Sequence, residues 1–557
     1  MHSRFSIVSR RRFLGRVLPL GAWAALSSLT DVPLVVRRAL AETSLGRRGR
    51  KLLFLFLRGG NDALNSVLPV GDDAYGPSIR PTLAIPTDPG LDYSAKGPCD
   101  FPESGPNRPT FDYGYALRSG NGFAALHPSL KFLAPLYNAG ELAILHRVGY
   151  PQQSRSHFDS QNYWETGNPN DDFSRDGILY RTLIESGLTQ TSPLTGVSFQ
   201  SSLPLILRGS QAAMTNLSDP GRYSLRGIPN NAAGTAKAEA ALRAALEAPL
   251  PDKRNRDLLH LQYRNLAETL SIFASLDFSE AGNTFRDAIA TDGDTDPYHL
   301  FPTTNAKNGG YALHGNDPSK YVVPTGSSSF FARLKSAAIV LNKTDAIVAG
   351  TEFGGFDTHS DQGGVTGSHA NLQRRIAWAL YALQRYFTRY ADRAHWSDVV
   401  VVTLSEFGRT TLQNDDAGTD HAEAGVMWVA GGALRGYGRS DHGSGLFGIS
   451  PGDRANGQSV PWINGPNGSM FGVKRRYLKR AIDYRSVLGE LIRDHLGASP
   501  DQLGRIIPGY RDPAEHLQSG GISGLDAARI LGELNLVPTP PLQARRKSSV
   551  NGRSASG

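Results

Sequence analysis

The stretch Lys51 to Leu57 (KLLFLFL) is a continuous apolar run that ends abruptly in Arg58-Gly59-Gly60-Asn61-Asp62. A run with apolar side chains on both faces is typical of a strand in a parallel sheet that helices cover on both sides. Similar apolar runs recur at 142–145, 346–350, 399–404 and 426–430, and helical patterns stand between them. This strand-then-helix order predicts an α/β fold with a doubly wound, mostly parallel sheet.

The spacing of apolar residues predicts the remaining elements. We expect helices at 129–139, 157–164, 331–341 and 372–390, and short strands near 194–199 and 203–207. An alanine- and leucine-rich segment at about 230–290 predicts a helical insertion. Stretches rich in Pro, Gly and Asp at 71–128 and 301–330 predict long surface loops.

Composition limits the class of protein. The chain has 557 residues, of which 39% are hydrophobic, so it can build a sizeable core. Its one cysteine, Cys99, excludes a disulfide framework. The first 41 residues and the tail from Pro538 carry +6 and +4 of the formal net charge of +8, which leaves about −2 for the rest. A basic groove for nucleic acid is therefore not predicted.

The N-terminal segment has the features of an export signal. Ser9-Arg10-Arg11-Arg12-Phe13-Leu14 precedes a short apolar run at 17–26, and Ala39-Leu40-Ala41 supplies small residues for cleavage. We expect a twin-arginine signal peptide at 1–41, the twin-arginine translocon as a transient partner, and a periplasmic or secreted mature chain. A basic amphipathic helix is the alternative.

The mature chain is expected to hold one α/β domain at 42–537, including the insertion, and a disordered basic tail at 538–557. No other segment reaches transmembrane length. Whether the basic tail makes peripheral contact with a membrane is left open.

Acids and histidines cluster at the ends of the predicted strands, where ligands bind in open α/β sheets. They are Asp62 after 51–57, Asp357 and His359 after 346–350, Glu406 and Arg409 after 399–404, and Asp420 and His421 before 426–430. Parallel topology would bring these ends to one edge of the sheet. We expect Asp62, Asp357, His359, Glu406 and His421 to hold a divalent metal, and Arg409 to bind anionic oxygens of a substrate.

The ligand types limit the metal. Mixed carboxylate and imidazole ligands suit zinc, manganese or iron, whereas carboxylates alone favour magnesium or calcium. Single residues also have simpler interpretations, because Asp62 fits an Asx-type turn and Glu406 fits the start of a helix.

Ser156 and His157 follow the predicted strand at 142–145. A hydroxyl at a helix start beside a divalent cation ionises more readily than in water, so Ser156 is a candidate nucleophile. His157 is a candidate metal ligand or hydrogen-bond donor to a substrate oxygen, and a purely structural role is the alternative. The alternatives are that Ser154 or a metal-bound water attacks, or that Ser156 merely caps the helix. The chain has no P-loop spacing and no Gly-x-Ser-x-Gly elbow.

Several motifs together resemble one known family. They are the twin-arginine leader, Phe56 to Asn65 (FLRGGNDALN), Ser156-His157-Phe158, Gly355-Phe356-Asp357-Thr358-His359 and Ser405-Glu406-Phe407-Gly408-Arg409. Over about residues 50–535 the chain is similar to the exported bacterial domain-of-unknown-function 1501 (DUF1501) family. That family is placed in the alkaline-phosphatase and sulfatase superfamily, so the resemblance implies an alkaline-phosphatase-like fold and metal-dependent hydrolysis.

The resemblance also suggests individual roles. Asp62 corresponds to the first-strand metal carboxylate, the Asp357–His359 pair to one metal site, and His421 to the final histidine ligand. Ser156 falls near the nucleophile, with Thr166-Gly167 closing the helix after it.

The chain also departs from the superfamily pattern. Phe407 follows Glu406 where a histidine commonly follows an aspartate, and the spacing from Asp357 to His359 is shorter than usual. One metal, or a metal other than zinc, is thus an alternative to a pair of zinc ions. The chain has no Cys-x-Pro-x-Arg sequence, which disfavours a formylglycine sulfatase.

The sequence therefore predicts an exported hydrolase of phosphate or sulfate esters that uses zinc, calcium, magnesium or manganese. Its expected partner is a small-molecule or polymer-borne anionic ester. We expect no nucleic-acid partner. A catalytically silent binding or assembly protein of the cell envelope with the same fold is the alternative.

Overall fold

The computed structural model describes a defined set of residues. They are 45, 46, 49–99, 114–190, 192–218, 232–247, 256–287, 299–303, 326–441, 443–453, 477–526 and 528–538. The expected signal peptide at 1–41 and all but the first residue of the expected basic tail lie outside them. Among the described helices, none combines the length and the apolar character needed to cross a bilayer.

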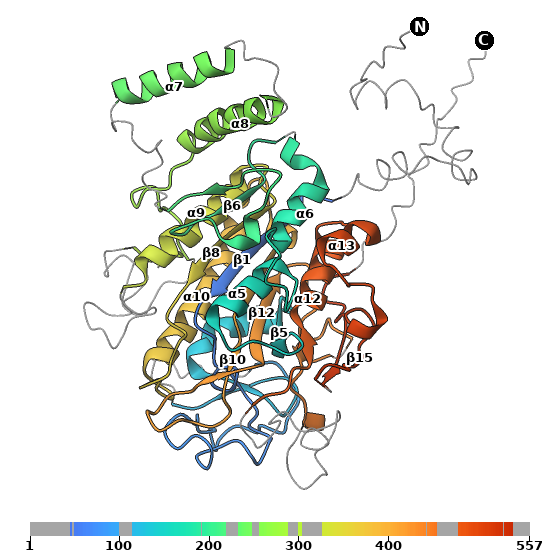
Figure 1. Ribbon diagram of the computed structural model, residues 1–557. Coiled ribbons are helices and arrows are strands. Elements are labelled where there is room, and N and C mark those ends of the chain that lie inside the picture. Colours follow the sequence, from blue (N-terminus) through green and yellow to red (C-terminus); the bar gives the residue numbers. More distant parts are fainter. Residues whose placement is uncertain are drawn as a thin grey trace, which may run out of the picture.

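A nine-stranded mixed sheet forms the centre of the molecule (Figure 1). Its strands are β1 (Lys51–Leu57), β5 (Leu142–Gly149), β6 (Gly196–Ser198), β7 (Thr215–Asn216), β8 (Val348–Phe353), β9 (Val399–Ser405), β12 (Gly425–Gly431), β13 (Leu446–Phe447) and β14 (Ile482–Asp483). The order is β13-β5-β12-β9-β1-β8-β6-β7, and β14 also pairs with β5. The predicted α/β class with a mostly parallel sheet is confirmed.

The central strand β1 pairs in parallel with β8 on one side and with β9 on the other. All seven of its residues are buried. Leu53, Leu55 and Leu57 face one hydrophobic core, whereas Leu52, Phe54 and Phe56 face a second core on the opposite side. This alternation is the reason that the strand is apolar on both faces.

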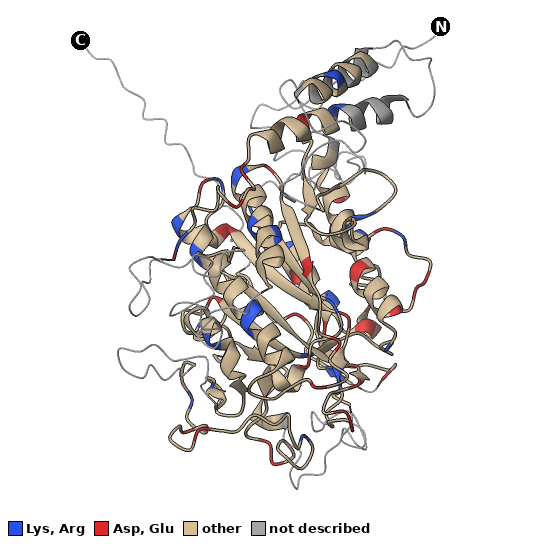
Figure 2. Ribbon diagram, turned by 90° about the vertical axis from the view of Figure 1, so that its left-hand side faces the viewer, with Lys and Arg blue, Asp and Glu red and all other residues tan. Residues whose placement is uncertain are grey.

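Helices supply the other half of each core. Residues of α9 (Ser328–Lys343) and α10 (Ser368–Arg389) pack in the first core. Residues of α6 (Ile178–Ser186), α12 (Tyr484–Glu490) and α13 (Pro500–Ile506) pack in the second. Figure 1 shows these two groups on opposite sides of the sheet, with α7 (Ala232–Glu247) and α8 (Arg256–Ala274) beyond one end of it. Helices α9 and α10, on the side of the molecule that faces the viewer in Figure 2, carry Lys and Arg but no Asp or Glu.

One strand of the sheet runs against its neighbours. β12 is antiparallel to both β9 and β5, so its first residue lies at the edge where β1, β8, β9 and β5 end. The residues before β12 and those after the other four strands therefore meet at one edge. An entirely parallel arrangement would have placed the start of β12 at the opposite edge.

The structure corrects some of the expected elements. The strand expected at 203–207 is a 3₁₀-helix at Leu205–Leu207 whose N-cap is Pro204, since proline lacks the N–H that a ladder needs and suits a helix start. The helix expected at 129–139 is a 3₁₀-helix at Pro128–Leu133 followed by α4 (Ala134–Asn138). The expected loop region at 71–128 contains two strands of a small three-stranded sheet, β3 (Leu117–Arg118) and β4 (Ala125–Leu126). β4 is the central strand and pairs with β2 (Val67–Leu68) on one side and with β3 on the other.

Candidate metal centre

Three elements bring the candidate ligands to the edge of the sheet. His157 is the first residue of α5 (His157–Thr166), whose N-cap is Ser156. Asp357 and His359 lie in the loop that follows β8. His421 begins the short strand β11 (His421–Ala422), where it pairs directly with Arg409 of β10 (Gly408–Arg409). Ligands from three distant parts of the sequence are thereby placed together.

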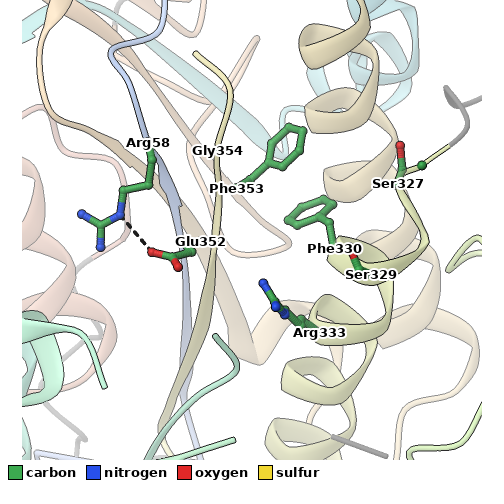
Figure 3. Close-up of a pocket in the computed structure, with 9 residues that line it drawn as sticks. Arg58, Ser327, Ser329, Phe330, Arg333, Glu352, Phe353 and Gly354 are labelled. Carbon is green, nitrogen blue, oxygen red and sulfur yellow. Dashed lines mark hydrogen bonds and ion pairs between the residues drawn. The ribbon is translucent and has the colours of Figure 1, made fainter. Parts of the chain in front are cut away.

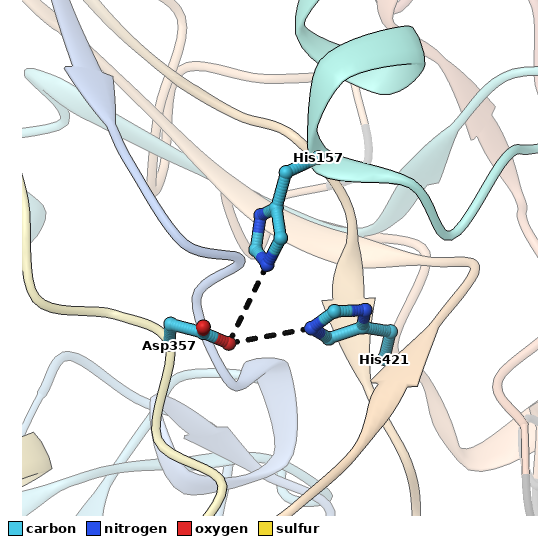
Figure 4. A group of neighbouring side chains, drawn as sticks. All are labelled: His157, Asp357 and His421. Atoms are coloured by element: carbon cyan, nitrogen blue, oxygen red, sulfur yellow. Dashed lines mark hydrogen bonds and ion pairs between the residues drawn. The ribbon is translucent and has the colours of Figure 1, made fainter.

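The side chains of His157, Asp357 and His421 form a compact group in which the nearest ligand atoms all lie within 4.8 Å of one another (Figure 4). Asp357 Oδ1 is 3.6 Å from His157 Nε2 and 3.3 Å from His421 Nε2. His359 Nε2 is 3.1 Å from the same carboxylate oxygen and 2.8 Å from His421 Nε2. In a tetrahedral zinc site with bonds of about 2.0–2.1 Å, ligand atoms lie roughly 3.3 Å apart. The spacing thus fits a cation between them.

An oxygen acceptor at Nδ1 orients each of the three imidazole rings. His421 Nδ1 is 2.9 Å from the backbone oxygen of Arg155. His359 Nδ1 is 3.2 Å from Asp420 Oδ1, and His157 Nδ1 contacts Glu406 Oε2. In the neutral ring a proton on Nδ1 satisfies these acceptors, and each Nε2 then presents a lone pair to the centre.

Charge at the centre favours this protonation pattern. Burial, together with the Arg409 guanidinium, lowers the pKa of His421, so its ring is neutral near pH 7. Burial opposes ionisation of Asp357, but Arg409 outweighs it and lowers the pKa of that carboxyl. The side chains of Asp357 and His359 remain about half exposed, so a ligand from solvent can reach them.

Glu406 lies behind His157 rather than facing the centre. Its side chain is fully buried, one oxygen contacts His157 Nδ1, and the other accepts a hydrogen bond from Gln161 Nε2 at 2.6 Å. Ligating histidines typically donate their second N–H to a carboxylate, which fixes the ring and raises its basicity. Glu406, which the sequence suggested as a direct ligand, is placed in this supporting position.

Arg409 is buried and its nitrogens already donate to protein oxygens. Nε donates to Gly60 O at 2.9 Å, Nη1 to Thr419 O at 2.9 Å, and Nη2 to Asp357 Oδ1 at 2.6 Å. Its guanidinium therefore fixes Asp357 and the loop ends around it. This geometry favours a positioning role over the expected contact with substrate.

Asp62 is held within the protein by an ion pair. Its Oδ2 accepts from Arg80 Nη1 and Gln362 Nε2, each at 2.6 Å, and its Oδ1 accepts from the Leu64 N–H at 3.1 Å. Burial would raise the pKa of Asp62, but Arg80 outweighs it and lowers that pKa to about 2. The structure places Asp62 as the N-cap of the 3₁₀-helix Ala63–Asn65, and its oxygens are engaged by protein donors.

Ser156 caps α5, because its Oγ accepts from the Asp159 N–H at 3.4 Å. The cap leaves the hydroxyl proton without an acceptor among the described residues. Ser156 thus occupies the capping position that was one of its two interpretations, directly before His157.

The sequence did not single out two of the supporting residues. Gln161 stands four positions after His157 and so lies on the same face of α5, a signal that helical periodicity contains. Asn414 donates to both His359 O at 2.9 Å and Asp420 Oδ1 at 3.2 Å, and the sequence gives no pattern that singles it out.

Comparison with known proteins gives one match. Residues 49–444 match the protein family described as "Protein of unknown function (DUF1501)". No curated protein and no solved structure matches the chain. All the side chains of the candidate centre and their supporting partners fall inside the matched range.

Proposed function

The chain belongs to the DUF1501 family of proteins of unknown function, and we propose that it is an exported metal-dependent hydrolase of phosphate or sulfate esters. The observation that carries the proposal is the convergence of His157, Asp357 and His421 on one point, with His359 beside them. The resemblance of the sequence motifs to those of the alkaline-phosphatase and sulfatase superfamily supports the class of ester. The arginine-rich leader supports export.

The donor set fits a transition metal. Two Nε2 lone pairs, from His157 and His421, and one carboxylate oxygen face the same point, and His359 Nε2 lies 3.1 Å from that oxygen. Without a cation these groups repel one another. The positive charge of Arg409 offsets only the negative charge of the Asp357 carboxylate. Imidazole-rich sites with one carboxylate suit zinc or manganese better than calcium or magnesium. We propose that His157, Asp357, His359 and His421 hold one such ion, with Glu406 and Asp420 orienting two of the rings.

A divalent cation at this centre would supply Lewis acidity, polarising an ester oxygen and promoting ionisation of a nearby hydroxyl or water. The chain's own residues orient the reactants. Ser156 presents a hydroxyl beside His157, and Glu406 keeps the His157 ring in one tautomer. Ser156 is the proposed nucleophile, with solvent as the alternative attacking group.

Metal-dependent turnover tests this function. The purified chain is assayed with aryl phosphates, phosphodiesters and aryl sulfates after addition of zinc, manganese, magnesium or calcium. We expect turnover with zinc or manganese that His421→Ala abolishes, whereas the control His516→Asn, which removes an imidazole outside the centre, retains it. Absence of metal-dependent turnover on every ester, or equal activity of His421→Ala and the wild type, would overturn the proposal.

A further inference from the structure

A pocket of about 320 Å³ opens at the carboxyl ends of β1 and β8, against the first turns of α9 (Figure 3). Arg58 follows β1 directly, and Glu352 and Phe353 end β8. Ser329, Phe330 and Arg333 come from α9. In open α/β sheets this edge is where ligands bind. None of these residues belongs to the candidate metal centre.

The charges in the pocket are unequally compensated. Arg58 is engaged, because its Nε donates to Glu352 Oε2 at 3.1 Å and its Nη2 pairs with Glu165 Oε1 at 2.9 Å. Glu352 in turn also accepts from Gln200 Nε2 at 3.3 Å. Arg333 is half-buried and has neither a hydrogen bond nor an ion pair with any residue that the structure describes. One cation thus lines the pocket without an anionic partner in the part of the chain that the structure describes.

Other groups around Arg333 also suit an anion. Figure 3 shows its guanidinium directed toward the space between Glu352 and Phe330. No described side chain caps the N-terminus of α9, so the N–H groups of its first turn have no side-chain acceptor among the described residues. The helix dipole favours negative charge at the same end. The Phe330 and Phe353 rings, stacked with centroids 4.5 Å apart, form an apolar wall beside the cation.

The pocket lies close to the candidate metal centre along the chain. Gly354 lines the pocket, and Asp357 of the centre follows three residues later. Three residues span at most roughly 11 Å, so one small molecule is long enough to touch both. We infer that the pocket is a subsite for a small oxyanion, such as a carboxylate, sulfate or phosphate, which the substrate carries in addition to its reacting ester. This substrate class rests on the proposed hydrolase function.

Direct anion binding tests the subsite without relying on catalysis. Inorganic sulfate, inorganic phosphate and benzoate are titrated by calorimetry, at constant ionic strength, into chain treated with a chelator. We expect Arg333→Gln to weaken binding of the preferred anion at least tenfold, and Arg333→Lys to retain most of it. The three probes identify which oxyanion the pocket prefers. Arg393→Gln, which removes an exposed arginine elsewhere, is the matched control for net charge.

Two results would overturn the subsite: equal affinity of Arg333→Gln and the wild type, or an equal loss in Arg393→Gln. Because the protein has been treated with a chelator, failure of the proposed metal centre would leave Arg333-dependent binding intact. It is therefore distinguishable from failure of the subsite.

The link to substrate is tested by kinetics on ester pairs with and without a second anionic group. We expect Arg333→Gln to raise KM at least tenfold for the doubly anionic ester only, with little change in kcat. Equal effects on both esters would contradict the link.

Discussion

The Nε2 atoms of His359 and His421 lie 2.8 Å apart, and the Nδ1 atom of each ring faces an oxygen acceptor. In the neutral form, two rings held in this way direct lone pairs at each other. His157 Nε2 and the Asp357 carboxylate lie with His421 Nε2 in one group of close ligand atoms. The supporting oxygens of Glu406, Asp420 and the Arg155 backbone thus prepare the centre for a cation.

Glu406→Gln tests the support of His157. An amide nitrogen in place of Glu406 Oε2 would face the His157 N–H with another donor, and an amide flip would lose the bond from Gln161 instead. Loss of such outer partners typically weakens metal binding by about 10–100-fold. We expect zinc affinity to fall by about that factor in competition with a chelator. Glu185→Gln, which disturbs only the ion pair with Arg505, serves as the control and should bind like the wild type.

Gly59 allows the first strand to approach the Asp357 loop. It has φ +113°, and an added Cβ would lie 2.4 Å from the Asp357 backbone nitrogen. Gly59→Ala should therefore displace Asp357 and weaken metal binding at least tenfold. Gly438 has φ +68° with nothing within 4 Å of an added Cβ, so Gly438→Ala imposes the backbone strain alone. Similar metal affinities for the two variants would show that the close approach does not position Asp357.

The Asp62–Arg80 ion pair is predicted to stabilise the fold without holding metal. Both side chains are fully buried, and removing one partner of a buried pair costs about 3–5 kcal/mol. Arg80→Met should lower the free energy of unfolding in urea by about that amount. Arg393→Gln breaks an exposed pair and should cost less than about 1 kcal/mol.

Metal analysis of Asp62→Asn separates the two roles of this residue. Because the Asp62 oxygens are engaged by Arg80, Gln362 and the Leu64 N–H, we expect the variant to keep its bound metal. Loss of the metal from a folded Asp62→Asn chain would assign Asp62 to the centre, as the superfamily resemblance suggested.

Buried histidines predict loss of stability in mild acid. Burial lowers the pKa of His495 to about 4 and that of His127 to about 3, against 6.5 when exposed. The unfolded chain therefore binds more protons below pH 6.5, so stability is complete above that pH and falls as pH approaches 4. Each ring contributes a loss of about 2 kcal/mol between pH 6.5 and 5.

Urea unfolding at several pH values measures this effect. His495→Gln should reduce the dependence of unfolding free energy on pH. A wild-type unfolding free energy that stays constant from pH 7 to pH 5 would contradict the prediction.

Much of the sheet was predictable because its strands are apolar on both faces. β1, β8 and β9 follow directly from their runs of buried residues, and each is followed by polar residues at the predicted edge. Strand direction is not encoded in such runs. The strand at β12 was expected, but its antiparallel direction was not predicted. That direction is what brings His421 to the edge.

The residue types of the candidate site were more predictable from the sequence than the role of each residue. Strand ends identify which carboxylates and imidazoles are near the edge, but not which way a side chain turns. Asp62 turns to Arg80, which lies in a region expected to be loop, and Glu406 turns to His157. Such partners depend on pairs of residues up to hundreds of positions apart, for which one sequence gives no signal.

Anomalous X-ray scattering from crystals of the purified chain, measured across the zinc and manganese edges, tests the central claim most directly. If the ion is zinc, we expect one peak about 2.0–2.1 Å from the Nε2 atoms of His157 and His421 and next to Asp357 Oδ1. The peak should be missing in His421→Ala. The bound-metal hypothesis would be contradicted if wild-type crystals grown with zinc or with manganese showed no peak and His359 and His421 shared a proton instead.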